Sequence, residues 1–140
     1  MKFVAFDLGS KTLGLAVSDK SESFSLSRPT IFYSNYDFDE LFVSLDEFMK
    51  EEKPEIIILG IPYNMDGSMS THGKKVIEFK ELLTKYKLEI ILSDERLTSR
   101  IANSYLENGN VSKHKRKKVI DGIAASIILQ GHLDKINRGK

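Results

Sequence analysis

The order in which apolar patterns follow one another along the chain is the strongest constraint on its fold. Short apolar runs typical of strands cover residues 2–8, 13–18, about 30–33, 55–59 and 88–93. Apolar positions at helical spacing cover residues 39–52, 70–86, about 98–108 and 117–136. This order, β-β-β-α-β-α-β-α-α, predicts an α/β domain with a mixed five-stranded sheet and helices on both faces.

The first two strand-like runs are joined by a loop of hairpin length, Gly9-Ser10-Lys11-Thr12. Both runs are apolar at alternate and intervening positions alike, so we expect these strands to be covered on both faces. The third run follows Pro29 and completes an antiparallel meander. Alternating helices and strands then complete the layered domain.

The length of 140 residues is that of one domain, so we predict a single domain over residues 1–140. The chain has no cysteine, which excludes disulfides, a thiolate nucleophile and any metal site built on cysteine. A metal would therefore be held by oxygen or imidazole ligands. The apolar runs are far shorter than the roughly 18 residues of a membrane span. The first residues do not resemble a signal peptide, and we expect a cytoplasmic protein without a membrane partner.

The formal net charge of +1 hides a separation of charge along the chain. Residues 1–110 carry 13 Lys and Arg against 18 Asp and Glu, a balance of −5, and residues 111–140 carry 8 against 2, a balance of +6. A basic segment on an acidic body is a pattern typical of proteins that bind nucleic acid.

Most of this positive charge lies in the basic run, residues 113–118, which holds Lys113, Lys115, Arg116, Lys117 and Lys118 around His114. We predict that it contacts the phosphate backbone of a nucleic acid. The alternative is a solvated charged turn, which is weakened here because cations oppose the helix dipole at an N-terminus. Few aromatic residues are interleaved with the run, so base stacking is not predicted there.

Carboxylates follow two of the predicted strands. Asp7 ends an otherwise apolar strand, where an unpaired charge would be costly, and Gly9 lets a ligand come close. Asp94 and Glu95 end the fifth strand and could join Asp7 if the first and fifth strands run parallel. The alternatives are an acidic hairpin turn at Asp7 and an ordinary acidic helix start after Asp94, with Arg96 pairing locally.

Asp121 lies in the predicted last helix, on the side that carries Ala124, Ala125 and Ile128. A carboxylate on a packed face needs a partner, either a lysine or a metal shared with Asp7. The segment 64–68 is interpreted as an Asp-Gly turn, with a phosphate-facing helix start as the alternative. His72 and His132 lack ligand-like spacing and are interpreted as ordinary.

Four ordered motifs, spread over nearly the whole chain, closely resemble those of the YqgF family, whose members are described as Holliday-junction resolvases or pre-16S rRNA nucleases. They are Asp7-x-Gly9-x-Lys11-x-x-Gly14-x-Ala16-x-Ser18-Asp19, Gly60-x-Pro62-x-Asn64-Met65-Asp66-Gly67, Asp94-Glu95-Arg96-Leu97-Thr98 and Asp121-x-x-Ala124-Ala125-x-x-Ile128-Leu129-Gln130. The chain departs from the family at Thr12, where arginine is common, and at Gly122, where alanine is common.

The resemblance implies an RNase H-like fold and a metal-dependent nuclease. Asp7, Glu95 and Asp121 would hold one or two Mg²⁺ or Mn²⁺ ions, with Asp94 as the alternative to Glu95. Lys11 and Arg96 would offset charge on the scissile phosphate, and the basic run would hold the flanking backbone.

The resemblance implies two substrates, and we expect precursor rRNA, processed at the 5′ end of pre-16S rRNA during ribosome biogenesis. The alternative is a branched DNA junction, whose symmetric cleavage needs two active sites and hence a dimer; we expect a monomer or weak homodimer. Two other readings are a catalytically silent RNA-binding assembly module and an actin-like ATPase or sugar kinase. An actin-like ATPase or sugar kinase closes two domains of this kind around a nucleotide, and the chain supplies one such domain.

Overall fold

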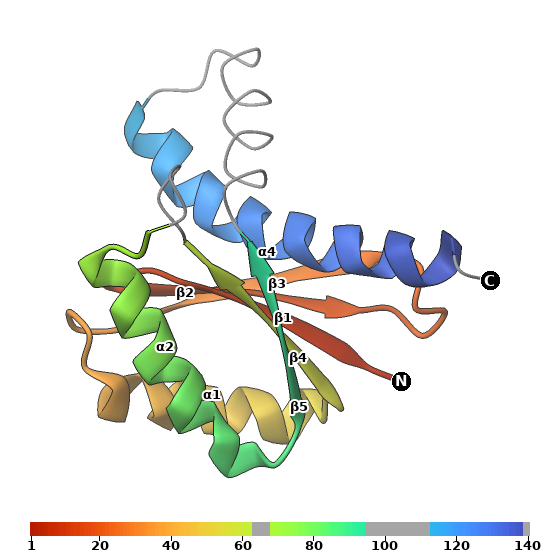
Figure 1. Ribbon diagram of the computed structural model, residues 1–140, viewed down its shortest axis with the longest axis horizontal. Coiled ribbons are helices and arrows are strands. Elements are labelled where there is room, and N and C mark those ends of the chain that lie inside the picture. Colours follow the sequence, from red (N-terminus) through yellow and green to blue (C-terminus); the bar gives the residue numbers. More distant parts are fainter. Residues whose placement is uncertain (63–67, 95–112, 139–140) are drawn as a thin grey trace.

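The computed structural model describes residues 1–62, 68–94 and 113–138, with only the backbone described for 113–122 and Arg138. The elements, in chain order, are β1 (Phe3–Leu8), β2 (Thr12–Ser18), β3 (Ser25–Phe32), α1 (Phe38–Glu52), β4 (Ile56–Ile61), α2 (Thr71–Leu83), the 3₁₀ helix η1 (Thr84–Tyr86), β5 (Glu89–Asp94) and α4 (Lys113–Arg138) (Figure 1). The helix predicted over about 98–108 lies outside the described residues.

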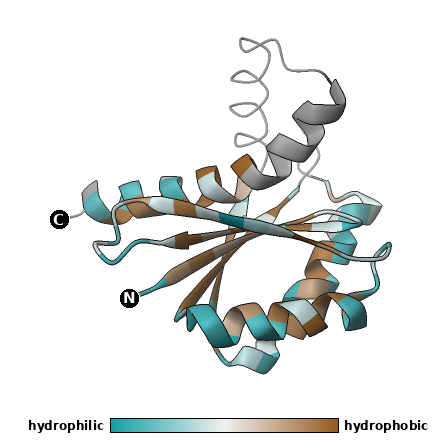
Figure 2. Cartoon of the chain, turned by 180° about the vertical axis from the view of Figure 1, so that it is seen from behind, coloured by the Kyte–Doolittle hydropathy of each residue, from teal (hydrophilic) through white to brown (hydrophobic). Residues whose placement is uncertain are grey.

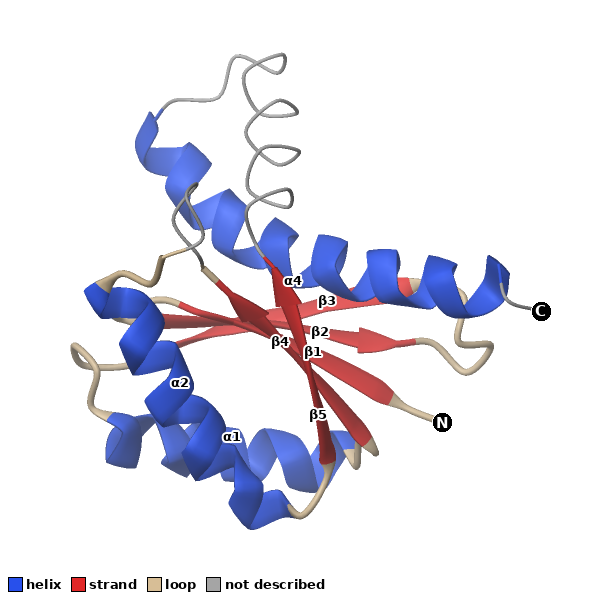
Figure 3. Ribbon diagram, in the orientation of Figure 1, coloured by secondary structure: helices blue, strands red, loops and turns tan. Residues whose placement is uncertain are grey.

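The five strands form one mixed sheet in the order β3-β2-β1-β4-β5 (Figure 3). β1 pairs with β2, and β2 with β3, in antiparallel fashion. β1 pairs with β4, and β4 with β5, in parallel. The predicted meander and mixed sheet are therefore confirmed, and the carboxyl ends of β1, β4 and β5 lie at one edge, which we call the carboxyl edge.

Three predicted boundaries are wrong in ways that have physical causes. β3 begins at Ser25 rather than near residue 30, because it is an edge strand whose first residues are polar and partly exposed and so lack an apolar signal. α4 begins at Lys113 rather than about residue 117, because its first turn is basic and has no apolar periodicity. The helix predicted over 70–86 ends at Leu83 and continues as η1.

Helices cover both faces of the sheet, as predicted. α1 and α2 pack on one face, the α1/α2 face, and α4 packs on the other, the α4 face (Figure 1). Val4, Phe6 and Leu8 of β1 join the core under α1 and α2, and Phe3 and Ala5 join the core under α4. Figure 2 shows apolar colour along the strands and on the sides of helices α1 and α2 that face them. Burial of each large apolar side chain contributes about 1.5–3 kcal/mol.

The carboxyl-terminal half of α4 is fixed to the start of β3 by hydrogen bonds. The Ser25 amide donates to Gln130 Oε1 at 2.9 Å, and the Ser25 hydroxyl donates to the Ser126 carbonyl at 2.9 Å. Gln130 Nε2 in turn donates to the Ser23 carbonyl at 2.8 Å. The helix has 26 residues and is about 39 Å long. Its amino-terminal part therefore extends beyond these anchors and rises away from the sheet (Figure 1).

No helix within the described ranges is long and apolar enough to cross a membrane.

Candidate functional site

Asp7 lies near the carboxyl end of β1, half-buried, on the α4 face of the sheet. This orientation follows from strand alternation, because Ala5 belongs to the core under α4 and Phe6 to the core under α1 and α2. Across β2, the residue opposite Asp7 is Gly14. Across β4, the register that pairs Phe6 with Leu59 brings Gly60 to the same level as Asp7.

The Asp7 carboxylate therefore lies between two glycines in neighbouring strands. Gly60 is in turn opposite Ser93 of β5, so the row across the α4 face reads Gly14, Asp7, Gly60 and Ser93. The residues directly opposite Asp7 in both neighbouring strands are therefore glycines. The sequence motifs contain both glycines, but only the strand register shows that they flank the acid.

Asp94 ends β5 and lies at the same carboxyl edge as Asp7, since β1, β4 and β5 are mutually parallel. The condition under which these acids could join Asp7, that the first and fifth strands run parallel, is therefore met. The two backbones are two strand spacings apart, about 10 Å. The side chains point to opposite faces, however, because Asp94 pairs with Ile61 and Ile61 belongs to the core under α1 and α2.

Lys11 is exposed in the loop between β1 and β2. Gly9 makes this loop tight: its amide donates to the Thr12 carbonyl at 2.7 Å, and a Cβ at Gly9 would lie 2.6 Å from Thr12 Oγ1. Only glycine fits at that position without a shift of Thr12. The loop therefore holds Lys11 close to the end of β1.

The carbonyls of residues 8–11 all receive hydrogen bonds from outside the hairpin. The Tyr33 hydroxyl donates to the Gly9 carbonyl at 2.6 Å, and the Tyr33 amide donates to the Lys11 carbonyl at 3.0 Å. The Tyr36 amide donates to the Ser10 carbonyl at 2.8 Å. Burial raises the pKa of Tyr33, as does its proximity to Tyr36, so the hydroxyl stays protonated and able to donate.

His72 of α2 provides the fourth of these bonds. Its Nε2 lies 2.8 Å from the Leu8 carbonyl oxygen, and its Nδ1 lies 2.5 Å from the Tyr36 hydroxyl. Because a carbonyl only accepts, Nε2 carries the proton and Nδ1 accepts from Tyr36. Sequence reasoning missed this role, since His72 and Leu8 are 64 residues apart and no local pattern links them.

Asp121 lies in α4, which runs antiparallel to β1 (Figure 1). The His132 ring packs 5.4 Å from the Phe3 ring, which fixes the two elements relative to each other. From that contact, Asp7 is about 13 Å along β1 and the backbone of Asp121 about 16 Å along α4, in the same direction. The backbone of Asp121 therefore lies toward the carboxyl edge.

The remaining predicted residues are less fully described. Glu95 and Arg96 lie outside the described residues. The basic run, residues 113–118, forms the first turns of α4, with its backbone alone described. Within the described part of the chain, no group of three or more His, Cys, Asp or Glu side chains is placed to hold a metal ion.

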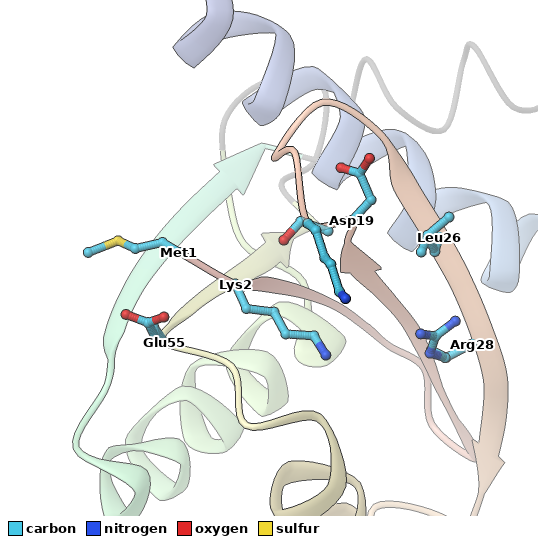
Figure 4. Close-up of a pocket in the computed structure, with 8 residues that line it drawn as sticks. Met1, Lys2, Asp19, Leu26, Arg28 and Glu55 are labelled. Atoms are coloured by element: carbon cyan, nitrogen blue, oxygen red, sulfur yellow. The ribbon is translucent and has the colours of Figure 1, made fainter.

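A cavity of about 610 Å³ is lined by residues at the amino end of β1 and the carboxyl end of β2 (Figure 4). Asp7 lies near the other end of β1. The cavity lining includes Lys2, Asp19, Arg28 and Glu55, and none of the predicted site residues. Lys2 and Arg28 each form an ion pair with Glu52, at 2.6 and 2.9 Å. These two cations thus share one carboxylate partner within the protein, and this cavity is not the predicted site.

Comparison with known proteins shows similarity along nearly the whole chain. The family model described as "RuvX: Holliday junction resolvase" matches residues 1–135. A protein from Bacillus subtilis (strain 168), described as "Putative pre-16S rRNA nuclease", is 40% identical over 138 residues, which is 98% of this chain and 100% of that protein.

Solved structures show the same fold at low sequence identity. The RuvC protein of T. thermophilus, solved with a Holliday junction substrate, has a TM-score of 0.57 at 10% identity and covers 91% of each chain. This likeness shows the RNase H-like fold. A Listeria monocytogenes protein described as "a putative N-acetylmannosamine kinase" has a TM-score of 0.50 at 23% identity, and the match spans only 40% of that longer chain.

Proposed function

The chain belongs to the RuvX family of Holliday junction resolvases, which is the YqgF family that its motifs resemble, and from this premise we propose that it is a metal-dependent nuclease that processes the 5′ end of pre-16S rRNA in the cytoplasm. Its full-length similarity to a protein described as a pre-16S rRNA nuclease supports the substrate. The observation that carries the chemistry is the position of Asp7 at the carboxyl edge of parallel strands, between two glycines.

Asp7 is suited to hold a hydrated cation. Mg²⁺ and Mn²⁺ prefer carboxylate oxygen and keep several water molecules, so a ligand in a crowded row would be a poor one. Gly14 and Gly60 leave the neighbouring strands without side chains at this level. The donor set fits the cation, since the chain has no cysteine and the predicted ligands are all carboxylates.

Strand alternation favours Glu95 over Asp94 as the second ligand. Asp94 lies on the α1/α2 face, opposite to the face of Asp7. This orientation separates the Asp94 side chain from Asp7 and leaves Glu95, the next acid of the motif, as the proposed second ligand. Asp121 would complete the set from α4, since helical spacing places it one turn before the buried residue Ala125.

A divalent cation held by Asp7, Glu95 and Asp121 would supply Lewis acidity toward a phosphoryl oxygen and activate water. The protein's own groups would align the strand. Lys11, on its fixed loop, and Arg96 would offset charge on the scissile phosphate. The basic run, residues 113–118, extends along the part of α4 that rises from the sheet and would hold flanking phosphates.

A cleavage assay tests this function. The wild-type protein with Mg²⁺ or Mn²⁺ is compared on precursor rRNA, single-stranded DNA and a four-way DNA junction, with Asp7→Asn alongside and its folding checked by circular dichroism. We expect cleavage of precursor rRNA by the wild type and its loss in Asp7→Asn. Persistence of the wild-type rate in a folded Asp7→Asn protein would contradict the assignment of Asp7. Binding of RNA without metal-dependent cleavage would favour a silent assembly module.

Resolution of Holliday junctions is the second candidate, favoured by the description of the matching family. Symmetric cleavage of a junction requires two active sites and hence two copies of this single-domain chain. We propose a monomer or weak homodimer for the free protein. Sedimentation of the protein with and without junction DNA tests this second candidate. A protein that stays monomeric on the junction cannot cleave it symmetrically.

A further inference from the structure

Phe32, the last residue of β3, leaves a large aromatic ring in contact with solvent. Its side chain is 69% exposed, whereas the next residue, Tyr33, is buried in the core. A single exposed apolar residue is ordinary on a protein surface. Phe32 differs from an ordinary exposed residue in its position, which is close to the candidate site.

Phe32 lies on the same face of the sheet as Asp7. It pairs with Thr12, while its neighbour Ile31 pairs with Leu13 and packs against the core under α1 and α2. Alternation therefore directs the Phe32 ring to the α4 face, which Asp7 shares.

The two residues lie at a distance suited to one bound strand. Phe32 is two strands from Asp7 across the sheet and two residues further along it, since Asp7 is opposite Gly14 and Phe32 is opposite Thr12. With spacings of about 4.8 Å and 3.3 Å, the backbones are about 12 Å apart. That distance corresponds to roughly three nucleotides of a stacked strand at about 3.4 Å each.

The backbone on either side of the ring is rigidly held. The residue after Phe32, Tyr33, bonds to the Lys11 carbonyl through its amide and to the Gly9 carbonyl through its hydroxyl. Lys11 is exposed and directly precedes Thr12, the residue opposite Phe32. The aromatic ring, the Lys11 cation and the Asp7 carboxylate are thus carried by one hydrogen-bonded backbone frame. A preformed frame reduces the entropic cost of binding a flexible strand.

α4 covers the other end of β3. Its contact with this strand is at Ser25, which bonds to Ser126 and Gln130, seven residues before Phe32. Over seven residues a strand extends about 23 Å, so these anchors are far from the ring. The face of Phe32 is accessible to a ligand that crosses the carboxyl edge.

We propose that Phe32 stacks on an unpaired base of the substrate strand, about three nucleotides from the phosphate bound at Asp7, and so selects a single-stranded flank. This inference rests on the proposed nuclease function. A base offers its face to a protein ring only where it is unpaired or unstacked, and such stacking does not depend on sequence. Phe32 therefore discriminates a single-stranded RNA flank from a fully paired duplex or junction arm.

The test measures binding without cleavage. Fluorescence anisotropy of a labelled single-stranded oligoribonucleotide, and of the same strand in a duplex, is recorded in EDTA for the wild type, Phe32→Ala, Phe32→Leu and Phe32→Trp. We expect Phe32→Ala and Phe32→Leu to weaken single-strand binding about 5-fold or more, the effect of losing one stacked base. Phe32→Trp retains affinity, and duplex binding is unchanged in all three.

Phe24 provides the matched control. Its side chain is 64% exposed, close to the value for Phe32, but it lies just before β3, at the opposite end of the sheet. Phe24→Ala is expected to bind the single strand as the wild type does. Equal losses in Phe24→Ala and Phe32→Ala, or duplex binding reduced as much as single-strand binding, would overturn the inference.

A 2-aminopurine base in the strand gives a second readout. Stacking on Phe32 quenches its fluorescence, and Phe32→Leu abolishes that quenching at saturating protein. If Phe32→Ala binds as the wild type does while Asp7→Asn abolishes cleavage, the stacking role is wrong and the nuclease assignment stands. If the single strand stacks on Phe32 but no strand is cleaved, the chain binds RNA and the nuclease assignment is wrong.

Discussion

The two ends of the sheet use charged residues in opposite ways. At the amino end of β1, opposite charges form ion pairs: Lys2 and Arg28 both bind Glu52, and the Met1 amine binds Glu22 at 3.1 Å. Asp19, at the same end, accepts hydrogen bonds from the Ser21 hydroxyl and from the Ser23 and Phe24 amides, which lower its pKa. This end is a network that holds the termini of the strands together.

At the carboxyl edge, hydrogen bonds secure the backbone of the hairpin, and glycines lie on both sides of Asp7. Tyr33, Tyr36 and His72 bond to consecutive carbonyls of the hairpin, while Gly14 and Gly60 flank Asp7. A binding site needs fixed groups, and the hydrogen bonds to the hairpin carbonyls fix the backbone beside Asp7. The comparison suggests a division of roles, in which the amino end stabilises the fold and the carboxyl edge is our proposed ligand site, so substitutions at the two ends should affect different measurements.

The largest expected effect is the loss of cleavage in Asp7→Asn. Loss of a group that hydrogen-bonds to a metal ligand already costs about 10- to 100-fold in activity, so replacing a direct ligand should reduce cleavage more than about 100-fold. The melting temperature should stay within a few degrees of wild type, because the amide keeps the size of the carboxylate. Cleavage rates and thermal melting of the same preparations check both expectations.

Glu52→Gln is the corresponding acid-to-amide substitution at the amino end, and we expect it to affect stability rather than cleavage. The Glu52 side chain is only 16% exposed and binds both Lys2 and Arg28. Its replacement should cost about 1–3 kcal/mol of stability, since two cations lose a charged partner. Cleavage measured well below the melting temperature should not change. If fully folded Glu52→Gln protein loses cleavage activity, the amino end contributes to activity as well as to stability.

A smaller loss is expected when the row beside Asp7 is filled. Gly60→Ala places a methyl group on the α4 face, next to the Asp7 carboxylate. We expect about a 10-fold loss of cleavage, comparable with other disturbances around a metal ligand, and weaker Mn²⁺ binding by electron paramagnetic resonance.

Gly131→Ala is the control for added volume. Gly131 lies in α4, and a Cβ there meets nothing within 4 Å. The substitution should leave cleavage unchanged and raise stability by about 0.5–1 kcal/mol, because alanine is the better helix former. If Gly60→Ala binds Mn²⁺ and cleaves as well as Gly131→Ala, the glycine row is not needed for the site.

His72→Leu tests whether the hairpin must be held from α2. The change leaves the Leu8 carbonyl and the Tyr36 hydroxyl without their ring partner and should cost about 1–3 kcal/mol of stability. His72→Gln keeps one donor and one acceptor and should recover part of this loss. Chemical denaturation measures the stability. If His72→Leu is as stable as the wild type, the hydrogen bonds of His72 to Leu8 and Tyr36 contribute nothing to the free energy of unfolding.

The sequence predicts the fold well because its main signals are local. Apolar periodicity gave the order of strands and helices, and that order implies the mixed sheet. It also located Asp7 and Asp94 at strand ends, which the parallel pairing brings to one edge. The start of β3 was missed because Ser25 and Ser27 on an edge strand have no apolar pattern.

The features missed at the site depend on register and on contacts between distant residues. That Gly60 flanks Asp7 follows only from the pairing of Phe6 with Leu59. The exposure of Phe32 could not be read from an apolar run in which the adjacent Ile31 and Tyr33 are core residues. Local sequence patterns specify individual strands and helices. The candidate site depends on the register between neighbouring strands and on contacts between distant residues.

The smallest expected effect is on the pH dependence of stability. Burial raises the pKa of Glu52, but hydrogen bonds from Lys2 and Arg28 outweigh it, and the folded-state pKa lies below the ordinary value of 4.5. A lowered folded-state pKa means that the unfolded chain binds the proton more readily. The stabilisation from Glu52 is therefore fully present above pH 4.5 and is lost as the pH falls through the folded-state value. Melting temperatures of wild type and Glu52→Gln should differ most near neutral pH and converge in acid, whereas wild type and Gly131→Ala should keep a constant difference. If the difference in melting temperature between wild type and Glu52→Gln stays constant in acid, Glu52 stabilises the fold by packing, and its ion pairs do not stabilise the amino end.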